Sequence, residues 1–344
     1  MMKYQLAILS VSDPKYLRHL KTLLASVAQN FPVVKFYLHL INVEQSITEE
    51  LLNIYPHIEF SWHNQQFANQ ENKQAYCANI RASLIFELLQ QQDLSSLLYL
   101  DADSIVRKDL SELVKLIDTG DLVILERKNA AQARLRFPTG VIGIKNNSST
   151  IKFIERWRDL LYDNLYDWYS DQACFTQTYE QMSSQVKLVS LPPEYVDWNF
   201  LPLSPIWVGK GARKYEHKIY LLEEEYYLFL PKSEQERQKQ KIQLLEQQCL
   251  ALHEEKRAQK AEIKKLCAAK EDPQGKLLLI KTLEAKIERF KLKNQELNEA
   301  NQRLKTEIKR IKSSIVWKMS QQLGSVKQYS KLINKLLQIS NKRR

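Results

Sequence analysis

The sequence predicts an α/β domain with a mostly parallel sheet and flanking helices, followed by an α-helical coiled coil. Residues 1–231 alternate short apolar runs with amphipathic stretches, which is the order expected of a parallel sheet covered on both faces. After Pro231 the chain is rich in Glu, Gln and Lys, with apolar residues three and four positions apart, a pattern typical of helices that pack on one another. We therefore expect a domain boundary at residue 231.

Seven apolar runs of the first domain have the length and composition of strands. They cover residues 4–10, 35–41, 58–62, 97–100, 122–125, 140–145 and 186–191. Helices are expected between them over residues 16–28, 75–91, 111–117, 150–162 and 171–181. Five prolines between residues 192 and 231 then punctuate a loop-rich region that closes the domain.

The composition excludes several classes of protein. Hydrophobic residues make up 44% of the 344 residues, enough for a substantial core, and only 7 residues are Gly. No Gly-rich phosphate loop occurs, which argues against a P-loop and against a dinucleotide-binding fingerprint. The four cysteines form no CxxC pair, so we expect reduced thiols in a cytoplasmic protein. The N-terminal apolar run is too short for a signal peptide, and no stretch approaches a transmembrane span.

The net charge of +11 is distributed unevenly along the chain. Residues 232–344 contain 28 Lys and Arg against 13 Asp and Glu, whereas residues 1–231 contain 23 basic and 27 acidic residues. The basic character therefore belongs to the C-terminal third, and the first domain is mildly acidic. The basic residues show no groove-reading motif, so we do not expect a nucleic-acid partner.

Two carboxylates follow an apolar run at Leu97–Asp103, which reads LLYLDAD. If Leu97–Leu100 is a buried strand, Asp101 and Asp103 leave the sheet at its C-terminal edge, where ligands of open α/β sheets bind. Two hard oxygen ligands there suit Mg²⁺ or Mn²⁺ holding a diphosphate. The alternative for an isolated D-x-D is a helix N-cap followed by a surface Asp. The preceding strand favours the ligand site.

A heptad seam runs through the second half of the C-terminal region. Its members alternate steps of four and three, with Asn at two a positions: Leu283, Ile287, Phe290, Asn294, Leu297, Asn301, Leu304, Ile308 and Ile311. Because Asn at a favours two parallel strands, we expect a homodimer through a parallel coiled coil over residues 232–312, with a break at residues 272–275. The alternative is an antiparallel helical hairpin that folds back at Pro273.

The last segment, residues 313–344, contains seven basic residues and no acidic residue. Val326, Tyr329, Ile333, Leu336 and Leu337 form an apolar stripe on the expected helix. A basic amphipathic helix of this kind binds anionic membrane surfaces, so we expect a peripheral contact at the inner face of a membrane. The alternative is a helix packed on its dimer mate, with a solvated basic face.

The stretch RASL at Arg81, followed by LYLDADSIV from Leu98, resembles the core of GT-A-fold glycosyltransferases, especially family 8 and related nucleotide-diphospho-sugar transferases. The resemblance covers about residues 4–215, and the D-x-D with its strand and upstream helix is its most specific part. It implies a Rossmann-like GT-A sheet. By this resemblance Asp103 binds the metal, Asp101 binds the metal and the donor, and Arg81 binds the donor sugar or its diphosphate. The implied cofactor is Mn²⁺ or Mg²⁺.

Three further segments carry the resemblance on the donor side. The segment from Ser10 to Tyr16 is similar to the nucleotide-binding turn of the family, which implies donor contacts from Ser10, from Asp13 to the base edge and from Tyr16 by stacking. Asp13-Pro14 is equally typical of a helix N-terminus.

The segment FPTGVIGI resembles the strand whose backbone lies near the donor sugar, which assigns Thr139 and Gly140 to donor binding. The pair Asp171-Gln172 resembles that of the active-site helix, which implies a catalytic role for Asp171 at the sugar hydroxyls or near the anomeric carbon. The alternative for Asp171 is an N-cap of the following helix.

The segment Ile206–Lys214 resembles the late H-x-x-G-x-x-K stretch that closes over the diphosphate. The charge of the leaving diphosphate would be neutralised by Lys210 as a catalytic group and by Arg213 and Lys214 as donor-binding groups. The family's metal-binding His is absent, because Ile206 or Val208 stands in its place.

Together these features predict a metal-dependent, retaining glycosyltransferase of the hexosyltransferase type. Its donor would be a nucleotide sugar with UDP as the nucleotide, and its acceptor a glycan, a lipid-linked sugar or a glycoprotein. Two alternatives remain at this point. One is a catalytically degenerate head on a coiled-coil scaffold, which the missing His favours. The other is a sugar nucleotidyltransferase, which also uses paired carboxylates at a sheet edge.

Overall fold

The computed structural model describes residues 6–91, 94–229 and 234–268, together with 295, 296, 298, 299, 302–310 and 313. Contacts divide the chain into two compact units, Met1–His217 and Lys218–Arg344. The expected boundary at residue 231 remains a prediction about domains, while the division between units falls after His217.

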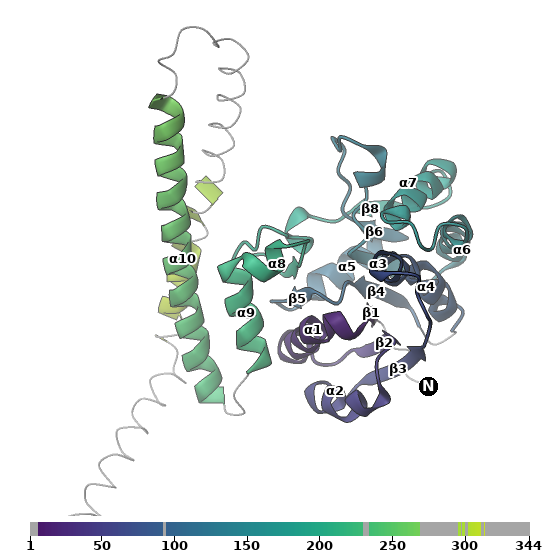
Figure 1. The fold of residues 1–344 in the computed structure, drawn as a ribbon, viewed down its shortest axis with the longest axis horizontal. Coiled ribbons are helices and arrows are strands. Elements are labelled where there is room, and N and C mark those ends of the chain that lie inside the picture. The colour runs from purple at the N-terminus through teal and green to yellow at the C-terminus, as the bar shows by residue number, and fades with distance from the viewer. Residues whose placement is uncertain are drawn as a thin grey trace, which may run out of the picture. The chain divides into compact units, whose positions relative to one another are not determined.

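The first unit is built on a sheet of seven strands in the order β3-β2-β1-β4-β7-β6-β8 (Figure 1). The strands are β1 (Ala7–Ser12), β2 (Lys35–Ile41), β3 (Ile58–His63), β4 (Ser96–Leu100), β6 (Leu122–Ile124), β7 (Val141–Lys145) and β8 (Leu188–Ser190). Four of the strand pairs are parallel, and β7 runs antiparallel to both of its neighbours, β4 and β6. The expected mostly parallel sheet with flanking helices is confirmed.

Alternation of side chains along the central strands creates two cores. In β1, Ala7, Leu9 and Val11 belong to one hydrophobic cluster, whereas Ile8 belongs to the other. Successive side chains of a strand point to opposite faces, so a strand that is apolar throughout must be covered on both sides. All six residues of β1 are buried, as this requires.

Helices cover each face of the sheet. The cluster that contains Ile8 includes side chains from α1 (Leu17–Asn30), α2 (Thr48–Ile54) and α5 (Ser111–Thr119). The opposite cluster includes side chains from α3 (Gln70–Asn79), α4 (Arg81–Leu89), α6 (Ser148–Tyr162) and α7 (Ser170–Met182). Figure 1 shows α1 and α2 on one side of the strands and α4 and α6 on the other.

Polar caps fix where two of these helices begin. The Asn69 side chain accepts the Asn72 N–H at 2.8 Å before α3, and the Asn147 side chain accepts the Thr150 N–H at 2.9 Å before α6. Each cap satisfies a backbone donor that the helix itself leaves without a partner.

A second, two-stranded sheet completes the unit. It pairs β5 (Ser104–Val106) with β9 (Ile206–Val208) in antiparallel orientation, with Ser104 opposite Val208. The strand β5 begins three residues after β4 ends, so this pairing brings the chain that follows β9 back to the edge of the large sheet. The next element is the short helix α8 (Arg213–Glu216).

The sequence pattern missed several elements. The helix α2 and the strands β5 and β9 were not expected, because each is too short to show a clear period. The single helix expected over residues 75–91 is two helices, since the chain breaks at Ile80 between α3 and α4.

The second unit contains α9 (Lys218–Leu228) and the long helix α10 (Glu234–Ala268). The Lys256 ammonium donates to Asn298 Oδ1, and Lys305 lies close enough to Cys249 to lower the pKa of its thiol, which burial raises. These two pairs run in opposite directions along the chain, so Cys249 and Lys256 lie near Lys305 and Asn298 in antiparallel order, which is the order that a helical hairpin predicts. The homodimer through a parallel coiled coil stays a prediction.

Most of the heptad seam, the break at 272–275 and, apart from residue 313, the basic tail lie outside the described residues. Within the described part, none of the helices has the length and hydropathy needed to span a bilayer. The expected peripheral membrane contact stays a prediction.

Replacing Gly143 with Ala should weaken the packing of α5 on the sheet. A Cβ atom at Gly143 in β7 would lie 2.6 Å from Ile117 Cγ1 and 3.2 Å from Val123 Cβ. Overpacking of this kind costs about 1–3 kcal/mol of unfolding free energy. Urea unfolding of Gly143→Ala measures it. The matched change Gly211→Ala meets no atom within 4 Å, so its cost is confined to the left-handed φ of 57°, about 1 kcal/mol. Equal losses in the two variants would contradict the tight packing.

The stability of the fold should fall in mild acid because of His39. Burial, and then the charge of His63, lower the pKa of His39 from 6.5 to about 4. Below pH 6.5 the unfolded chain takes up the proton first, so His39 lowers the unfolding free energy by up to about 3 kcal/mol between pH 6.5 and pH 4. Urea unfolding at both pH values measures this loss. It should be smaller in His39→Gln, and an identical loss in both proteins would refute the assignment.

Candidate functional site

The expected pair of carboxylates does follow the strand β4. After Leu100 the chain leaves the large sheet, and Asp101 and Asp103 lie at its C-terminal edge before β5 begins. The parallel neighbour of β4 is β1, with Leu9 opposite Tyr99, so the residues that follow β1 reach the same edge. This is the position at which open α/β sheets bind ligands.

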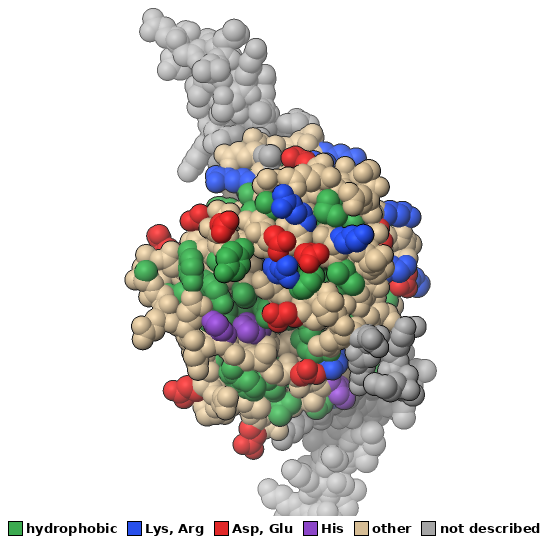
Figure 2. All heavy atoms as spheres, turned by 90° about the vertical axis from the view of Figure 1, so that its right-hand side faces the viewer, with side chains coloured by type: hydrophobic (Ala, Val, Ile, Leu, Met, Phe, Trp, Pro, Cys, Tyr) green, Lys and Arg blue, Asp and Glu red, His purple; other side chains and the backbone are tan. Residues whose placement is uncertain are grey.

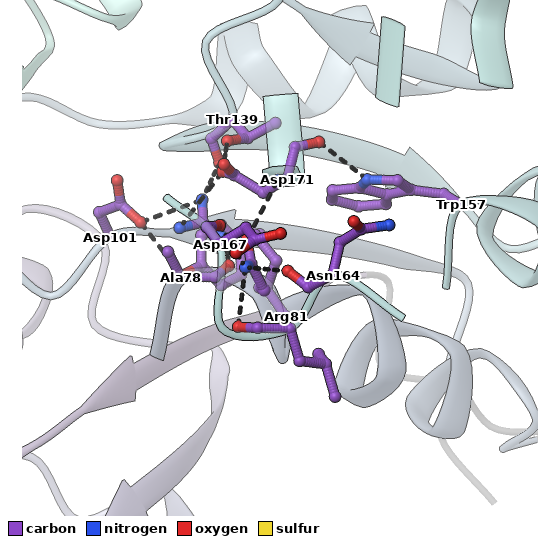
Figure 3. A network of polar contacts seen from close by, with 11 residues as sticks. Ala78, Arg81, Asp101, Thr139, Trp157, Asn164, Asp167 and Asp171 are labelled. Carbon is purple, nitrogen blue, oxygen red and sulfur yellow. Dashed lines mark hydrogen bonds and ion pairs between the residues drawn. The ribbon is translucent and has the colours of Figure 1, made fainter. Parts of the chain in front are cut away.

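Arg81 is the centre of the first group of site residues. Its side chain is 6% exposed, and Nη1 lies 3.2 Å from Asp101 Oδ1 and donates to Thr139 O at 2.6 Å (Figure 3). Nη2 lies 3.7 Å from Asp171 Oδ2, and Nε donates to Ala78 O. A buried guanidinium needs partners of this kind, because an unpaired charge in the interior is strongly destabilising. Arg81 therefore ties β4, the start of β7 and α7 together.

Tyr99 supports the pair of Arg81 and Asp101. Its hydroxyl donates to Asp101 Oδ1 at 3.1 Å, and the Arg81 guanidinium lies 4.6 Å from its ring centroid. Sequence reasoning missed this residue. The signal was present, because residues two apart on a strand share a face and Tyr99 precedes Asp101 by two.

Gly140 lets the chain pass close to Asp101. A Cβ atom at Gly140 would lie 2.6 Å from Asp101 Oδ2, and the Asp101 N–H donates to Gly140 O at 2.9 Å. Gly140, for which donor binding stays a prediction, therefore lies directly beside the Asp101 carboxylate. A side chain here would displace the Asp101 carboxylate from Arg81.

Asp171 lies in the first turn of α7 and faces Arg81. The Thr139 hydroxyl donates to Asp171 Oδ2, and the Trp157 Nε1–H donates to Asp171 O at 2.9 Å (Figure 3). The N-cap position is Tyr169, so the alternative that Asp171 caps the helix is wrong. Burial raises the pKa of Asp171, while Arg81 and the hydroxyl of Thr139 oppose this shift.

Asn79 connects this group to the loop between α6 and α7, and no pattern in the sequence indicates this role. Its Nδ2 donates to the carbonyls of Asn164, Leu165 and Asp167 at 3.1, 2.9 and 3.0 Å. Its Oδ1 accepts the Asp171 N–H at 3.0 Å. One buried amide therefore holds both the loop and the start of α7.

Asp103, Lys214 and Tyr16 form the second group. The Lys214 ammonium lies 2.5 Å from Asp103 Oδ2 and donates to Tyr16 Oη at 2.9 Å. Gly209 makes room for them, because a Cβ there would lie 2.9 Å from Lys214 Cδ and 3.0 Å from Asp103 Cβ. The Gly209 N–H donates to Asp103 O at 2.9 Å. Burial raises the pKa of Asp103, and Lys214 opposes this shift.

The turn after β1 has the cap that its sequence predicts. Asp13 Oδ1 accepts the Tyr16 N–H at 3.2 Å, with Pro14 in the first position of the short helix that follows. The other oxygen of Asp13 lies 2.8 Å from Lys73 Nζ, a partner that was not expected. Ser10 is fully buried in β1, and its Oγ has no hydrogen-bond partner among the described residues. Ser10 does not reach the surface in this structure.

The remaining two basic residues belong to a third group around Trp198. Lys210 and Arg127 both lie over this indole, 4.9 and 4.1 Å from its centroid, and Arg213 Nη1 donates to Trp198 O at 3.1 Å. Burial, followed by the charges of Arg127 and Arg213, lowers the pKa of Lys210. Lys210 and Arg213 therefore contact Trp198, whereas Lys214 contacts Asp103.

The residues at this edge do not fit a divalent cation. Asp103 is held by Lys214, and Asp101 is held by Arg81 and Tyr99. Ile206 and Val208 are buried apolar residues of β9, so neither side chain can bind a cation. In the part of the chain that the structure describes, no group of three His, Cys, Asp or Glu side chains could hold a metal ion.

Acidic and basic side chains alternate on the face of the molecule shown in Figure 2. Red and blue side chains lie next to one another near the middle of this face, among hydrophobic side chains, and are not separated into patches of one sign. A surface of this kind gives local charge pairs without a large field of one sign.

Comparison with known proteins finds no matching family model and no matching curated protein. Among solved structures, the glycosyltransferase GlyE of Streptococcus pneumoniae TIGR4 is 17% identical, with a TM-score of 0.48 over 65% of this chain and 60% of GlyE. The galactosyltransferase LgtC in complex with donor and acceptor sugar analogs is 14% identical, with a TM-score of 0.44 over 66% of this chain and 98% of LgtC.

The bifunctional glycosyltransferase WbbM is 12% identical, with a TM-score of 0.40 over 56% of this chain and 39% of WbbM. The chain thus spans less than two thirds of the length of GlyE. Likeness at this level assigns no activity.

Removing the Asn79 amide should loosen the loop before α7. Asn79→Ala leaves three partly buried carbonyls and the buried Asp171 N–H without their partner, which we expect to cost about 1–3 kcal/mol of unfolding free energy. Chymotrypsin should then cleave sooner at the exposed aromatic residues of 162–169. Asn72→Ala is the matched control, because Asn72 is only half-buried and contacts the same loop at Tyr166 O over 3.4 Å. Equal cleavage rates in the two variants would contradict the role of Asn79.

Proposed function

We propose that the first unit is a glycosyltransferase head that binds a nucleoside diphosphate sugar. The observation that carries the proposal is the buried Arg81, which joins Asp101 to Asp171 at the C-terminal edge of the sheet. The Asp101 side chain is still 30% exposed beside this cluster, and carboxylates of this kind bind sugar hydroxyls. We expect UDP as the nucleotide.

The reaction would transfer the sugar from the diphosphate to an acceptor hydroxyl. The bond between the anomeric carbon and the phosphate oxygen breaks, and its electron pair goes to the leaving diphosphate. A new bond forms between the anomeric carbon and the acceptor oxygen, whose proton passes to the departing phosphate oxygen. Negative charge develops on the leaving group, so nearby cations lower the barrier. We expect the configuration to be retained, as the resemblance to family 8 implies, which requires the acceptor to attack from the face that the diphosphate leaves.

The basic residues after β9 are suited to that charge. Lys210, Arg213 and Lys214 lie within five positions of one another, directly after the strand that returns to Asp103. Arg127 adds a fourth cation at Trp198. This concentration of positive charge offsets the buried carboxylates of the site.

The loop before α7 would face the acceptor. Tyr166, Trp168 and Tyr169 are exposed by 44%, 56% and 36%, and they directly precede Asp171. Exposed aromatic rings present flat apolar faces with a polar edge, which suits the mixed surface of a sugar ring. A glycan, a lipid-linked sugar or a glycoprotein carries such rings.

Two other functions predict different products. A degenerate head on a helical scaffold would bind no donor and release no nucleoside diphosphate. A sugar nucleotidyltransferase would release pyrophosphate in place of the nucleoside diphosphate. Product analysis therefore separates the three possibilities in one assay.

Replacing Asp171 with Asn should abolish most of the donor turnover. Purified full-length protein incubated with UDP-, GDP- and TDP-sugars should release one nucleoside diphosphate, and Asp171→Asn should lower that rate by about 10²-fold, because the carboxylate facing Arg81 is lost. Asp163→Asn is the matched control, since Asp163 is exposed at the end of α6. The assay separates and quantifies nucleotides by chromatography. Pyrophosphate as the product, or no turnover with any donor, would overturn the proposed function.

A further inference from the structure

The Lys214 ammonium is buried and held by Asp103 and Tyr16. Three separate parts of the chain meet there: Asp103 from the turn after β4, Tyr16 from the turn after β1, and Lys214 from α8. The Lys214 side chain is only 3% exposed, and that of Asp103 8%. An ion pair with so little exposure is fixed by its surroundings and is not a transient surface contact.

The backbone around the pair is shaped to hold it. The register of β5 and β9 places Val208 opposite Ser104, so Gly209 follows directly beside Asp103. Because a Cβ at Gly209 would collide with both members of the pair, only glycine fits the gap as it stands. Burial lowers the pKa of Lys214, but the charge of Asp103 and the hydroxyl of Tyr16 outweigh this effect and raise the pKa above its ordinary value.

A divalent cation at Asp103 would have to displace this ammonium. The displaced Lys214 would remain buried without its carboxylate, which is a strongly unfavourable state. The position from which an imidazole would complete a metal shell is also closed, because Ile206 is buried and paired with Val106 across β5 and β9. Both the ion pair of Asp103 with Lys214 and the buried side chain of Ile206 therefore oppose metal binding.

We propose that the Lys214 ammonium, held by Asp103 and Tyr16, takes the place of a divalent cation, so that this site binds the diphosphate of its donor without a metal. This inference rests on the proposed function. An ammonium has three N–H donors, and Asp103 and Tyr16 accept two of them within the described part of the chain. The third is left for a phosphate oxygen, for which Lys acts as a point charge.

The first test compares UDP binding to the full chain by calorimetry in EDTA and in Mn²⁺, with GDP and TDP as further probes. We expect one nucleotide to bind with dissociation constants within about threefold of each other in the two buffers. Binding that needs Mn²⁺ would overturn the inference and leave the proposed function intact. No binding of any nucleotide in either buffer would overturn both.

The second test exchanges one cation for the other. Lys214→Met should weaken UDP binding in EDTA by at least about tenfold, because the neutral thioether cannot donate to phosphate. Lys152→Met, an exposed site on α6, should leave it unchanged.

Titration of Mn²⁺, followed by its electron paramagnetic resonance signal, should show no binding to the parent chain with UDP. It should show binding to Lys214→Met combined with Ile206→His. Tight Mn²⁺ binding by the parent chain would overturn the inference, and that measurement needs no variant.

Discussion

The site depends on one constraint, which is that the guanidinium of Arg81 is buried and must be neutralised there. Asp101 and Asp171 supply the charge, and the carbonyl of Thr139 and the ring of Tyr99 complete its surroundings. These partners come from β4, from the start of β7 and from α7. The need to neutralise the Arg81 guanidinium therefore fixes the positions of these partners at the sheet edge.

The sequence predicted the sheet well, because its central strands are apolar on both faces and therefore read as continuous runs. It also placed Asp101 and Asp103 correctly at the end of β4. It could not find Asn79, since a single Asn within a helix gives no periodic signal and its partners lie more than eighty residues away. It also missed the pair of Asp103 and Lys214. The strands β5 and β9 are only three residues long, and their pairing is what brings Asp103 and Lys214 together.

The second unit shows how a heptad seam leaves the fold underdetermined. The same apolar spacing is compatible with a parallel pair of chains and with a hairpin within one chain. Asn at a positions favours the parallel pair. The hydrogen bond from Lys256 to Asn298 and the nearness of Lys305 to Cys249 fit an antiparallel order within one chain. Periodicity identifies the face of a helix that is buried, and it does not identify the helix that buries it.

The closed gap at Gly209 has an evolutionary consequence. Loss of the ammonium at position 214 would strand the Asp103 carboxylate in the interior, and an imidazole at position 206 would insert a polar ring into a sealed strand pair. Each change is harmful alone, so their effects are epistatic, and a lineage cannot drift between the two arrangements through single neutral steps. The ion pair beside Gly209 therefore makes an exchange of the ammonium for a metal-binding imidazole difficult in evolution.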